Sequence, residues 1–443
     1  MRVVLLTRRF GGEATATTAR LRAYVDALGT EGAEVIVLTR FPFVYRGRVP
    51  DPAHVGRLYR REQIDRATVV RIRIPGEHGI FKPVIGAVMR RWAQFRGAPA
   101  ASLEAADVLD MLYGLVAVPF VAMLRPRVIV IEQGPAFLGL PVGIFARFGI
   151  AIVLQVSDVK SLHMQRGRYG PATPNQVRAN RRAEESLYRR AAAIVTVTEA
   201  MRADIAKRLG RPVADVRMVP NGAELAAIGA ANPADKEACK RRLGLEGKFV
   251  ALYAGSFNVQ HDLHTLLEAA RRLQTDPEIA FVLMGSGPAE QELVGMARDA
   301  GLGNVVFFPA LPVSELSPYL GAADVGLATE IAGSQDNIPS KVYLYMAGRL
   351  PLVVTDDAGE TRALVARSGS GLLVPPSDAS AIVEKILELK RHPELAAALG
   401  NAGRLFVEAF HDRGQLARDF ARFVAEAAGR STRRLREPNG EAA

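Results

Sequence analysis

The chain has 443 residues, of which 49% are hydrophobic and 23% charged. This size and composition are typical of a globular protein with two or three domains. Its single cysteine, Cys239, excludes a disulfide framework and a cysteine-based zinc site. The net charge is +11, and the excess lies in residues 1–225, which carry 34 Lys and Arg against 19 Asp and Glu. This half is expected to meet a phosphorylated substrate, a nucleic acid or a membrane surface, unless the excess is only a solvated Arg-rich surface.

The N-terminus runs directly into a strand-like stretch and shows no pattern of a cleavable signal peptide. The most apolar region, residues 138–156, is interrupted by Pro141 and Arg147, so it is a poor membrane span. These features predict a cytoplasmic protein.

In the first half, short runs rich in β-branched residues alternate with stretches of helical periodicity. Such alternation predicts βαβ units and a parallel sheet that is buried on both faces. The expected strands are 2–7, 34–40, 68–74, 128–132, 151–156, 193–198 and 216–220.

A second series of the same kind follows a polar connection that begins near Asn221-Gly222. The expected strands are 249–256, 280–285, 305–309, 325–329, 350–355 and 371–375. The fold class is therefore α/β, with two doubly wound halves that would face each other across a cleft at the carboxyl ends of their strands. The expected organisation is an N-terminal domain over 1–222, a second domain over 223–405, a helix over 406–429 that returns to the first domain, and a disordered tail over 430–443.

Three loops that join a strand to a helix could bind an anion, because backbone amides at a helix start favour negative charge. Gly11-Gly12 follow the first strand, and Gly285-Ser286-Gly287 follow a strand of the second half. Neither loop completes a dinucleotide fingerprint or a P-loop, and a tight turn is the alternative for each.

The third loop, from Gln335 to Lys341, places polar side chains and a cation at a helix start. Asp336 could hold a sugar hydroxyl, and Lys341 with nearby amides could hold a diphosphate. An ordinary capped helix start is the alternative. Asp356-Asp357, after a later strand, has the composition of a metal pair but more often caps the following helix.

The order of these elements resembles the retaining glycosyltransferases of family 4, whose GT-B fold has two Rossmann-like domains. The co-linear matching segments lie between Phe10 and Ile386: FGGEATATTARLRAYVDALGTEGAEVIVLT, RRAAAIVTVTEAM, VRMVPNGAE, LYAGSFNVQHDLHTLLEAA, LMGSGP, NIPSKVYLYMAGRLPLVVTDDAGET and SGLLVPPSDASAIVEKI. The PSK at 339–341 and Gly359-Glu360 are similar to the branch that acts on lipid-linked sugars in polysaccharide and O-antigen assembly.

The resemblance implies that the second half binds a nucleotide sugar. Lys341 and Asp336 would act in catalysis, with Lys341 neutralising the leaving diphosphate. The other implied substrate-binding residues lie at loops that follow strands or open helices: Gly11, Gly12, Gly255, Ser256, Gly285, Ser286, Gly287, Leu311, Asn337, Ser340, Gly359, Glu360 and Thr361. Leu311 belongs to the stretch that would meet the base.

The sequence departs from the family at two places. The family's Glu-x7-Glu pair is represented by Asp336 and Leu344, and a leucine cannot accept a hydrogen bond from a ribose hydroxyl. The family's Arg and Lys after the first strand of the nucleotide domain are replaced by Ser256 and His261-Asp262.

The function implied is retaining transfer of a hexose from a nucleotide sugar, with a UDP-sugar favoured, to a lipid-linked or other glycan acceptor in surface polysaccharide biosynthesis. The class is EC 2.4, with no metal, no other cofactor and no nucleic-acid partner. Leu344 favours the alternative, a catalytically silent GT-B protein that serves as a scaffold in a polysaccharide assembly complex.

Residues 81–96 place apolar side chains at helical spacing, with Lys82, Arg90, Arg91 and Arg96 mostly off that stripe. A basic amphipathic helix of this kind could lie on an anionic membrane surface at the inner face of the cell membrane. A core helix that buries the same stripe is the alternative.

Overall fold

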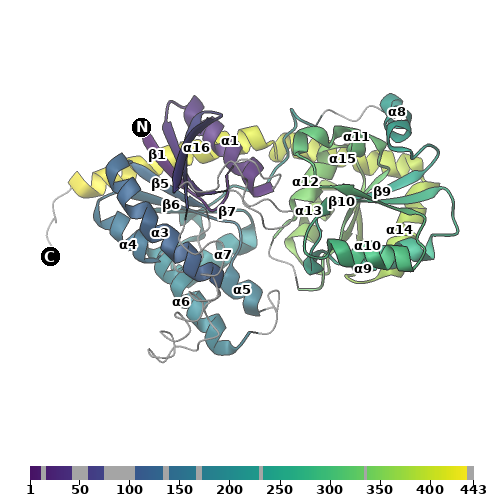
Figure 1. Cartoon of the computed structure of the whole chain (residues 1–443), viewed down its shortest axis with the longest axis horizontal. Helices are drawn as coiled ribbons and strands as arrows, with labels where there is room; N and C mark the ends of the chain where they lie inside the picture. Colours follow the sequence, from purple (N-terminus) through teal and green to yellow (C-terminus); the bar gives the residue numbers. More distant parts are fainter. Residues whose placement is uncertain are drawn as a thin grey trace. The chain divides into compact units, whose positions relative to one another are not determined.

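The computed structural model describes residues 1–10, 16–41, 58–73, 105–132, 139–165, 172–228, 233–333 and 337–436. The chain divides into two compact units (Figure 1). Unit 1 contains residues 17–219 with the N-terminal strand and the chain from Ala417 onward, and unit 2 contains residues 220–416. No described helix is both long enough and apolar enough to cross a membrane.

Unit 1 is built on a mixed sheet with the strand order β3-β4-β2-β1-β5-β6-β7-β8. All described neighbours in it are parallel except β3 and β4. The strands are β1 (Arg2–Leu6), β2 (Glu34–Arg40), β3 (Tyr59–Ile64), β4 (Ala67–Ile72), β5 (Val128–Glu132), β6 (Ala151–Val156), β7 (Ala193–Thr196) and β8 (Val216–Met218). The helices are α1 (Ala16–Thr30), α3 (Ala105–Leu124), α4 (Gly139–Arg147), α5 (Lys160–Gln165), α6 (Pro174–Arg190) and α7 (Glu199–Leu209).

Unit 2 holds a parallel sheet with the order β11-β10-β9-β12-β13-β14. Its strands are β9 (Phe249–Ser256), β10 (Ile279–Ser286), β11 (Val305–Pro309), β12 (Val325–Ala328), β13 (Leu352–Thr355) and β14 (Gly371–Val374). Its helices are α8 (Pro233–Leu243), α9 (Leu263–Arg272), α10 (Glu290–Asp299), α11 (Ser317–Ala322), α12 (Ser340–Ala347), α13 (Glu360–Ser368), α14 (Ala379–Arg391) and α15 (Pro393–Phe410). This order is that of a doubly wound dinucleotide-type sheet.

Helices cover both faces of the sheet of unit 2, as expected for strands that are apolar throughout. Alternate residues of β9 point to opposite faces: Leu252 packs in the core with α11, α12 and α15, whereas Tyr253 packs in the core with α9, α10 and α14. Figure 1 shows the two helix layers on either side of the strands. The α/β, two-unit prediction is confirmed.

The predicted strands agree with the observed ones to within two residues, and one strand was missed. That strand is β3, YRREQI, which pairs antiparallel with β4 at the edge of the sheet. Its charged side chains alternate between half-buried and exposed positions, as in a protected sheet edge. It therefore lacks the apolar run by which the buried strands were recognised.

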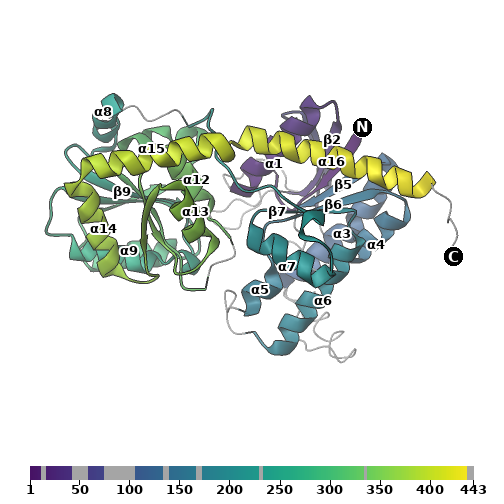
Figure 2. The same ribbon diagram turned by 180° about the vertical axis from the view of Figure 1, so that it is seen from behind.

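The C-terminal helix α16 (Arg413–Arg436) packs on unit 1 through one apolar stripe. The buried residues follow helical spacing: Ala417, Phe420, Ala421, Val424, Ala427 and Ala428. Phe420 stacks on Tyr24 of α1 with ring centroids 3.8 Å apart. Figure 2 shows α16 lying in front of the sheet of unit 1.

Two details of this region differ from the prediction of one helix over 406–429 followed by disorder. First, the helix is interrupted at His411 and Asp412, because Ala223 forms a β-bridge with Asp412 and donates its N–H to the carbonyl of His411 at 3.0 Å. Second, α16 continues to Arg436. Once a helix has formed and packed, adding a residue at its end avoids the unfavourable nucleation step and gains one backbone hydrogen bond.

Candidate functional site

The sheet of unit 2 has its topological switch point between β9 and β12, where ligands bind in doubly wound folds. The paired register of these two strands covers only Val325–Ala251 and Gly326–Leu252. Beyond that point the phenol of Tyr345 lies between them: it accepts the N–H of Ala254 at 2.7 Å and donates to the carbonyl of Leu327 at 3.2 Å. The side chain of Tyr345 thus separates the strands at their carboxyl ends.

Lys341, the second residue of α12, lies at the end of β9 beside this opening. Its Nζ lies 3.8 Å from the centroid of the Tyr253 ring, a cation–π contact. A Cβ at Gly255 would lie only 3.2 Å from the same Nζ, so the glycine provides room for the ammonium group. The phenol of Tyr253 is held by a 2.8 Å hydrogen bond to the carbonyl of Ser256.

Lys341 is only 6% exposed, and its buried ammonium group has no hydrogen-bond acceptor among the described residues. Burial lowers its pKa to about 7, and the carboxylate of Glu330 opposes that shift. A buried cation without an acceptor is costly. The position therefore suits an anionic ligand that supplies the missing acceptor.

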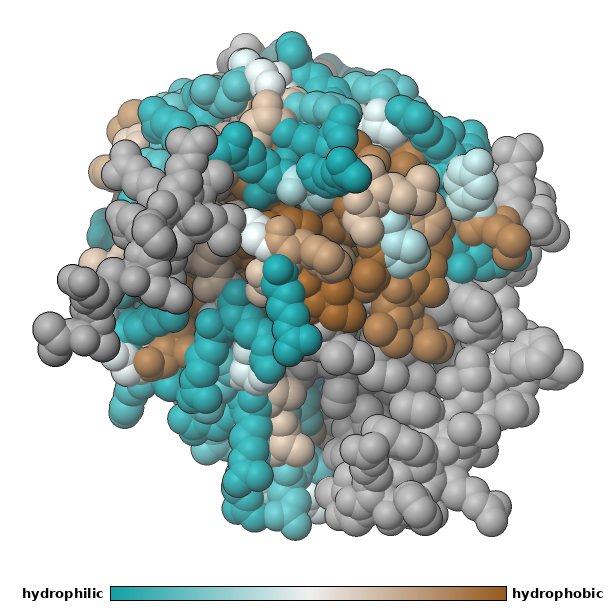
Figure 3. Space-filling model, turned by 90° about the vertical axis from the view of Figure 1, so that its left-hand side faces the viewer, coloured by the Kyte–Doolittle hydropathy of each residue, from teal (hydrophilic) through white to brown (hydrophobic). Residues whose placement is uncertain are grey.

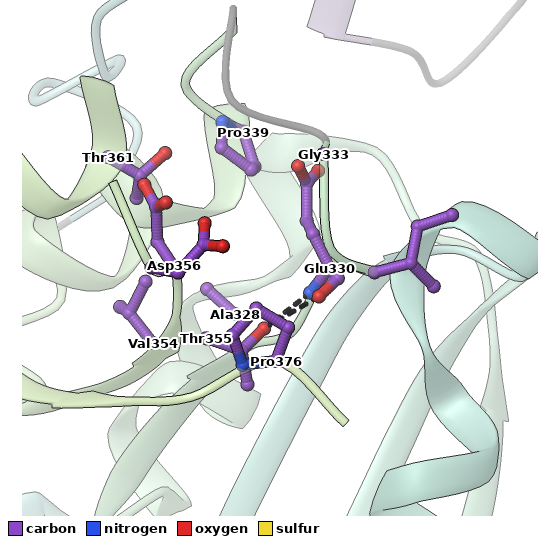
Figure 4. A pocket seen from close by; sticks show the side chains of 11 residues that line it. Ala328, Glu330, Gly333, Pro339, Val354, Thr355, Asp356, Thr361 and Pro376 are labelled. Atoms are coloured by element: carbon purple, nitrogen blue, oxygen red, sulfur yellow. Dashed lines mark hydrogen bonds between the residues drawn. The ribbon is translucent and has the colours of Figure 1, made fainter. Parts of the chain in front are cut away.

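A pocket in unit 2 lies between the ends of β12 and β13 and the start of α13 (Figure 4). Its lining residues are Ala328, Glu330, Ile331, Gly333, Pro339, Val354, Thr355, Asp356, Asp357, Thr361 and Pro376. The backbone of Glu330 is fixed by Thr355, whose hydroxyl accepts the Glu330 N–H at 2.7 Å and donates to its carbonyl at 3.0 Å. The Glu330 carboxylate lies 3.4 Å from Nδ1 of His261, an ion pair when the imidazole is protonated.

The start of α13 is organised by Asp356. Its carboxylate accepts the backbone N–H groups of Gly359 at 2.7 Å and Arg362 at 2.8 Å, which satisfies donors that a helix start leaves unpaired. The capping interpretation of Asp356 is therefore correct. No cluster of three or more metal-ligating side chains is present in the described part of the chain.

Replacing Asp356 with Ala should destabilise unit 2 by about 1 to 2 kcal/mol, because two helix-start amides lose a buried, charged acceptor. Urea unfolding of the variant beside the wild-type protein measures this loss. Asn at this position should retain only part of that stability, since its single amide oxygen replaces one carboxylate oxygen while its NH2 group faces the other backbone N–H. Wild-type stability in the Ala variant would contradict the capping role.

The end of β10 and the loop after it approach β9 very closely. A Cβ at Gly285 would lie 1.8 Å from the carbonyl oxygen of Gly255, and one at Gly287 would lie 2.2 Å from that of Phe257. The loop is bonded to β9 as well, since the N–H of Phe257 donates to the carbonyl of Ser286 at 2.9 Å. Only glycine permits this spacing, so both residues have a structural role whether or not they touch a ligand.

The other predicted site residues of unit 2 that the structure describes lie at the same carboxyl edge of the sheet. Asn337 precedes α12, and its Oδ1 is buried without a partner among the described residues; Ser340 is the first residue of that helix. Leu311 follows β11 and is partly buried against the core. Gly359, Glu360 and Thr361 form the start of α13, where Thr361 lines the pocket. Gly11, Gly12 and Asp336 lie outside the described residues, as do residues 81–96.

Sequence reasoning did not single out Tyr253, Tyr345 and Glu330 as part of this site. Tyr345 is recognisable only in retrospect, through Gly326: a Cβ there would lie 2.5 Å from the Tyr345 ring. Glu330 lies two residues after the end of β12, and a carboxylate this close to a strand of the switch point was a usable signal. Leu344 is partly buried against the core with its neighbours on α12.

Known proteins match both units. Residues 15–222 match the model of the glycosyl transferase 4-like domain, and residues 235–406 that of glycosyl transferases group 1. A putative colanic acid biosynthesis glycosyl transferase of Escherichia coli K12, WcaI, is 30% identical over 189 residues, which cover 41% of this chain and 46% of that protein.

Solved structures share the fold over nearly the whole chain. Sucrose-phosphate synthase from Thermosynechococcus elongatus gives a TM-score of 0.70 at 18% identity and covers 97% of this chain and 99% of its own. HepE from Anabaena in complex with UDP-glucose gives 0.67 at 16%, with coverage of 96% and 100%.

The chain therefore belongs to the GT-B glycosyltransferases, with the 4-like domain first and the group 1 domain second. The resemblance stated from the sequence is confirmed. The chain spans about half the length of the curated relatives that it matches.

Proposed function

We propose that the protein is a retaining glycosyltransferase of the family 4 type. It moves a hexose from a nucleotide sugar to a lipid-linked or other glycan acceptor. The reaction belongs to surface polysaccharide biosynthesis and takes place in the cytoplasm. The observation that carries the proposal is the buried ammonium of Lys341, which lacks an acceptor and lies at the switch point of unit 2. A UDP-sugar is the favoured donor, in line with the UDP-glucose bound by HepE. The relative WcaI is named for colanic acid biosynthesis.

In the proposed reaction the bond between the sugar's anomeric carbon and the diphosphate oxygen breaks, while the acceptor oxygen bonds to that carbon from the same face. The acceptor's proton passes to the departing diphosphate oxygen. Lys341 and the amides at the start of α13 stabilise the charge that develops on the diphosphate. Such preorganised donors act strongly in a buried site. This scheme requires no metal and no protein base.

The roles of the predicted residues follow from this scheme. Gly255 and Ser256 would lie along the diphosphate, and Gly285, Ser286 and Gly287 along the nucleotide. Asn337 and Ser340 would bind at the start of α12, and Glu360 and Thr361 at the start of α13. Because Leu344 cannot bind a ribose hydroxyl, we assign the carboxylate of Glu330, which lies at this end of the sheet, to a hydroxyl of the donor.

Nucleotide affinity should fall as the pH rises. The Lys341 pKa is about 7 in the free protein, and a bound diphosphate favours the protonated form and raises that pKa. Binding above this pH therefore takes up a proton, and affinity should drop on the order of tenfold between about pH 7 and pH 8.5. Calorimetric titration with UDP, GDP, ADP and CMP measures this.

The matched control is Lys341→Met, whose weaker affinity should not vary with pH over the same range. Micromolar binding of one nucleotide with this pH dependence supports the assignment. Equal affinity in wild type and variant would place the diphosphate elsewhere. Absence of binding by every nucleotide would refute the donor site.

A further inference from the structure

Two residues of unit 2 near the pocket have a left-handed backbone, although neither is glycine. Asp262 directly precedes α9 and has a φ of +46°, and Ser377 lies between β14 and α14 with a φ of +57°. Such angles cost free energy for residues other than glycine, and Asp tolerates them better than Ser. The two residues are bonded to each other, since the Ser377 hydroxyl donates to a carboxylate oxygen of Asp262 at 2.7 Å. Strain that collects at one contact points to a function of that contact.

The bond joins two loops at the carboxyl edge of the sheet. Asp262 ends the loop that follows β9, and Ser377 lies in the loop that follows β14. Asp262 is 7% exposed, and its other carboxylate oxygen accepts the hydroxyl of Thr265 at 2.8 Å. The carboxylate is therefore fixed on α9 and holds the loop after β14 in place. We call the Asp262–Ser377 contact the loop clamp.

The loop after β12 is attached to the same loop after β9. The hydroxyl of Thr329 donates to the carbonyl of His261 at 2.6 Å. The N–H of Ile331 donates to the carbonyl of Gln260 at 3.1 Å. Glu330 lies between these two anchors, with its carboxylate 3.4 Å from Nδ1 of His261. The end of the loop after β9 thus connects to both the loop after β12 and the loop after β14.

Both connected loops line the pocket (Figure 4). Glu330 comes from the loop after β12, and Pro376 comes from the loop after β14. Pro376 and His261 each directly precede a residue of the loop clamp. The clamp therefore fixes one wall of the pocket at Pro376, and it fixes the imidazole that lies beside the Glu330 carboxylate.

The order of the strands indicates which part of a donor this pocket would hold. The proposed nucleotide position is at the loop after β10, and the proposed diphosphate position is at the end of β9 beside Lys341. In the strand order β10-β9-β12-β13, the pocket continues the same line at β12 and β13. The sugar, which follows the diphosphate in a nucleotide sugar, would occupy it. This placement of the sugar rests on the proposed function, whereas the loop clamp itself does not.

We propose that Asp262 is a positioning residue for the donor sugar. Through the loop clamp it holds the pocket wall at Pro376, and through the adjacent His261 it orients the carboxylate of Glu330 toward a hydroxyl of the sugar. Asp262 itself touches neither the sugar nor the diphosphate. The backbone strain at Asp262 and Ser377 is retained because glycine at either position would release the clamp.

Substitution by glycine and by alanine separates positioning from folding. Asp262→Gly removes the clamp and relieves the positive φ, whereas Asp262→Ala removes the clamp and keeps the strain, so the Gly variant should melt at a higher temperature than the Ala variant. Both variants should nevertheless lose the same affinity, about tenfold, for a UDP-sugar, as when one hydrogen bond to a charged group is lost. Their affinity for UDP should stay within about twofold of wild type.

Calorimetric titration measures these affinities. The probes are UDP and the UDP-sugars of glucose, galactose and N-acetylglucosamine, and the comparison uses the UDP-sugar that the wild type binds best. Asp262→Asn should retain wild-type affinity for it. Asn tolerates the left-handed backbone, and its amide can accept from one hydroxyl and donate to the other, since a hydroxyl serves in either role.

The partner of the clamp gives a second, independent set of variants. Ser377→Gly should show the same selective loss, and combining it with Asp262→Gly should add no further loss, because both remove one contact. Thr265→Val is the matched control: it removes the other bond to Asp262 and leaves the clamp intact, so both affinities should be unchanged. Arg349→Gly relieves a φ of +55° between α12 and β13. It should raise the melting temperature without changing either affinity.

Unit 1 supplies a remote control. Figure 3 shows a face of this unit on which apolar side chains gather in one area bordered by polar ones. Met123 of this unit is 81% exposed. Met123→Ser should leave the affinity for both probes unchanged, because unit 1 contributes none of the three connected loops.

Hydrogen exchange of the unliganded protein tests the clamp without a nucleotide. Backbone amides of residues 257–262 and 375–378 should exchange about tenfold faster in Asp262→Gly than in Thr265→Val, because local opening of the two loops becomes easier. Equal exchange rates in these variants would show that the contact does not hold the loops, and would overturn the proposal.

The binding results separate this proposal from the proposed function. Absence of wild-type binding to UDP and to every UDP-sugar would refute the donor site, and the positioning role with it. Wild-type binding with an unchanged UDP-sugar affinity in Asp262→Gly would refute the positioning role alone. An equal loss for UDP and UDP-sugar, or a loss that follows the melting temperature from Gly to Ala, would also refute it.

Discussion

Replacing Lys341 with Met should lower turnover in the proposed transfer by about 10²-fold or more, as with the loss of a transition-state donor elsewhere. The variant should at the same time be more stable, by about 1 to 3 kcal/mol near neutral pH. Burial lowers the folded-state pKa of Lys341 to about 7 from its usual 10.5. Between these two values the unfolded chain binds more protons, so wild-type stability rises with pH through this window. Methionine removes that dependence.

A second buried lysine supplies the control. Lys240 on α8 is also 6% exposed, but its Nζ lies 3.0 Å from a carboxylate oxygen of Asp324. Lys240→Met should therefore destabilise the fold and leave the turnover of the folded protein unchanged. Steady-state kinetics and urea unfolding of both variants give the comparison. Full turnover in Lys341→Met, or a loss of equal size in both variants, would remove Lys341 from the chemistry.

Replacing Gly285 with Ala should destabilise unit 2 by about 3 kcal/mol or more and lower the yield of folded protein. The added Cβ would lie 1.8 Å from the carbonyl oxygen of Gly255 and 2.8 Å from the Phe257 ring. The first of these atoms belongs to the backbone of β9, which cannot move without disturbing the ladder between β9 and β10. Urea unfolding and the yield of soluble protein measure the effect.

Gly295 in the middle of α10 is the matched control, because a Cβ there meets nothing within 4 Å. Gly295→Ala should stabilise the protein by about 0.5 to 1 kcal/mol through helix propensity. If Gly285→Ala were equally well tolerated, the close approach of the loop to β9 would be wrong. Gly285 and Gly287 would then no longer be assigned to the surface that lines the nucleotide site next to β9.

The fold could be predicted from the sequence because its strands are apolar on both faces and are separated by helical periodicity. The edge strand β3 could not, since its charged residues resemble a surface loop. For the site, Lys341 was found from its place at a helix start after a polar loop. Its burial against Tyr253 could not be found, because that contact joins residues 88 positions apart across the sheet.

Tyr345 illustrates the same limit. Its neighbours on α12 follow the apolar spacing of a buried helix, so the pattern predicts that a tyrosine at this position is an ordinary residue of the hydrophobic core. Only the tertiary structure shows that its hydroxyl stands between Ala254 and Leu327. A phenol that replaces one backbone hydrogen bond of a sheet has no signature along the chain, since the two backbone groups and the side chain come from three separate elements.

The insertion of Tyr345 between β9 and β12 also bears on the transplantation of specificity between relatives. The width of the opening is fixed beneath the loops, by one aromatic ring packed over Gly326, rather than by the loops that surround it. A chimera that exchanges only those loops would keep the spacing of this chain. Exchanging positions 326 and 345 together would change the spacing between β9 and β12, and with it the position of any grafted loop.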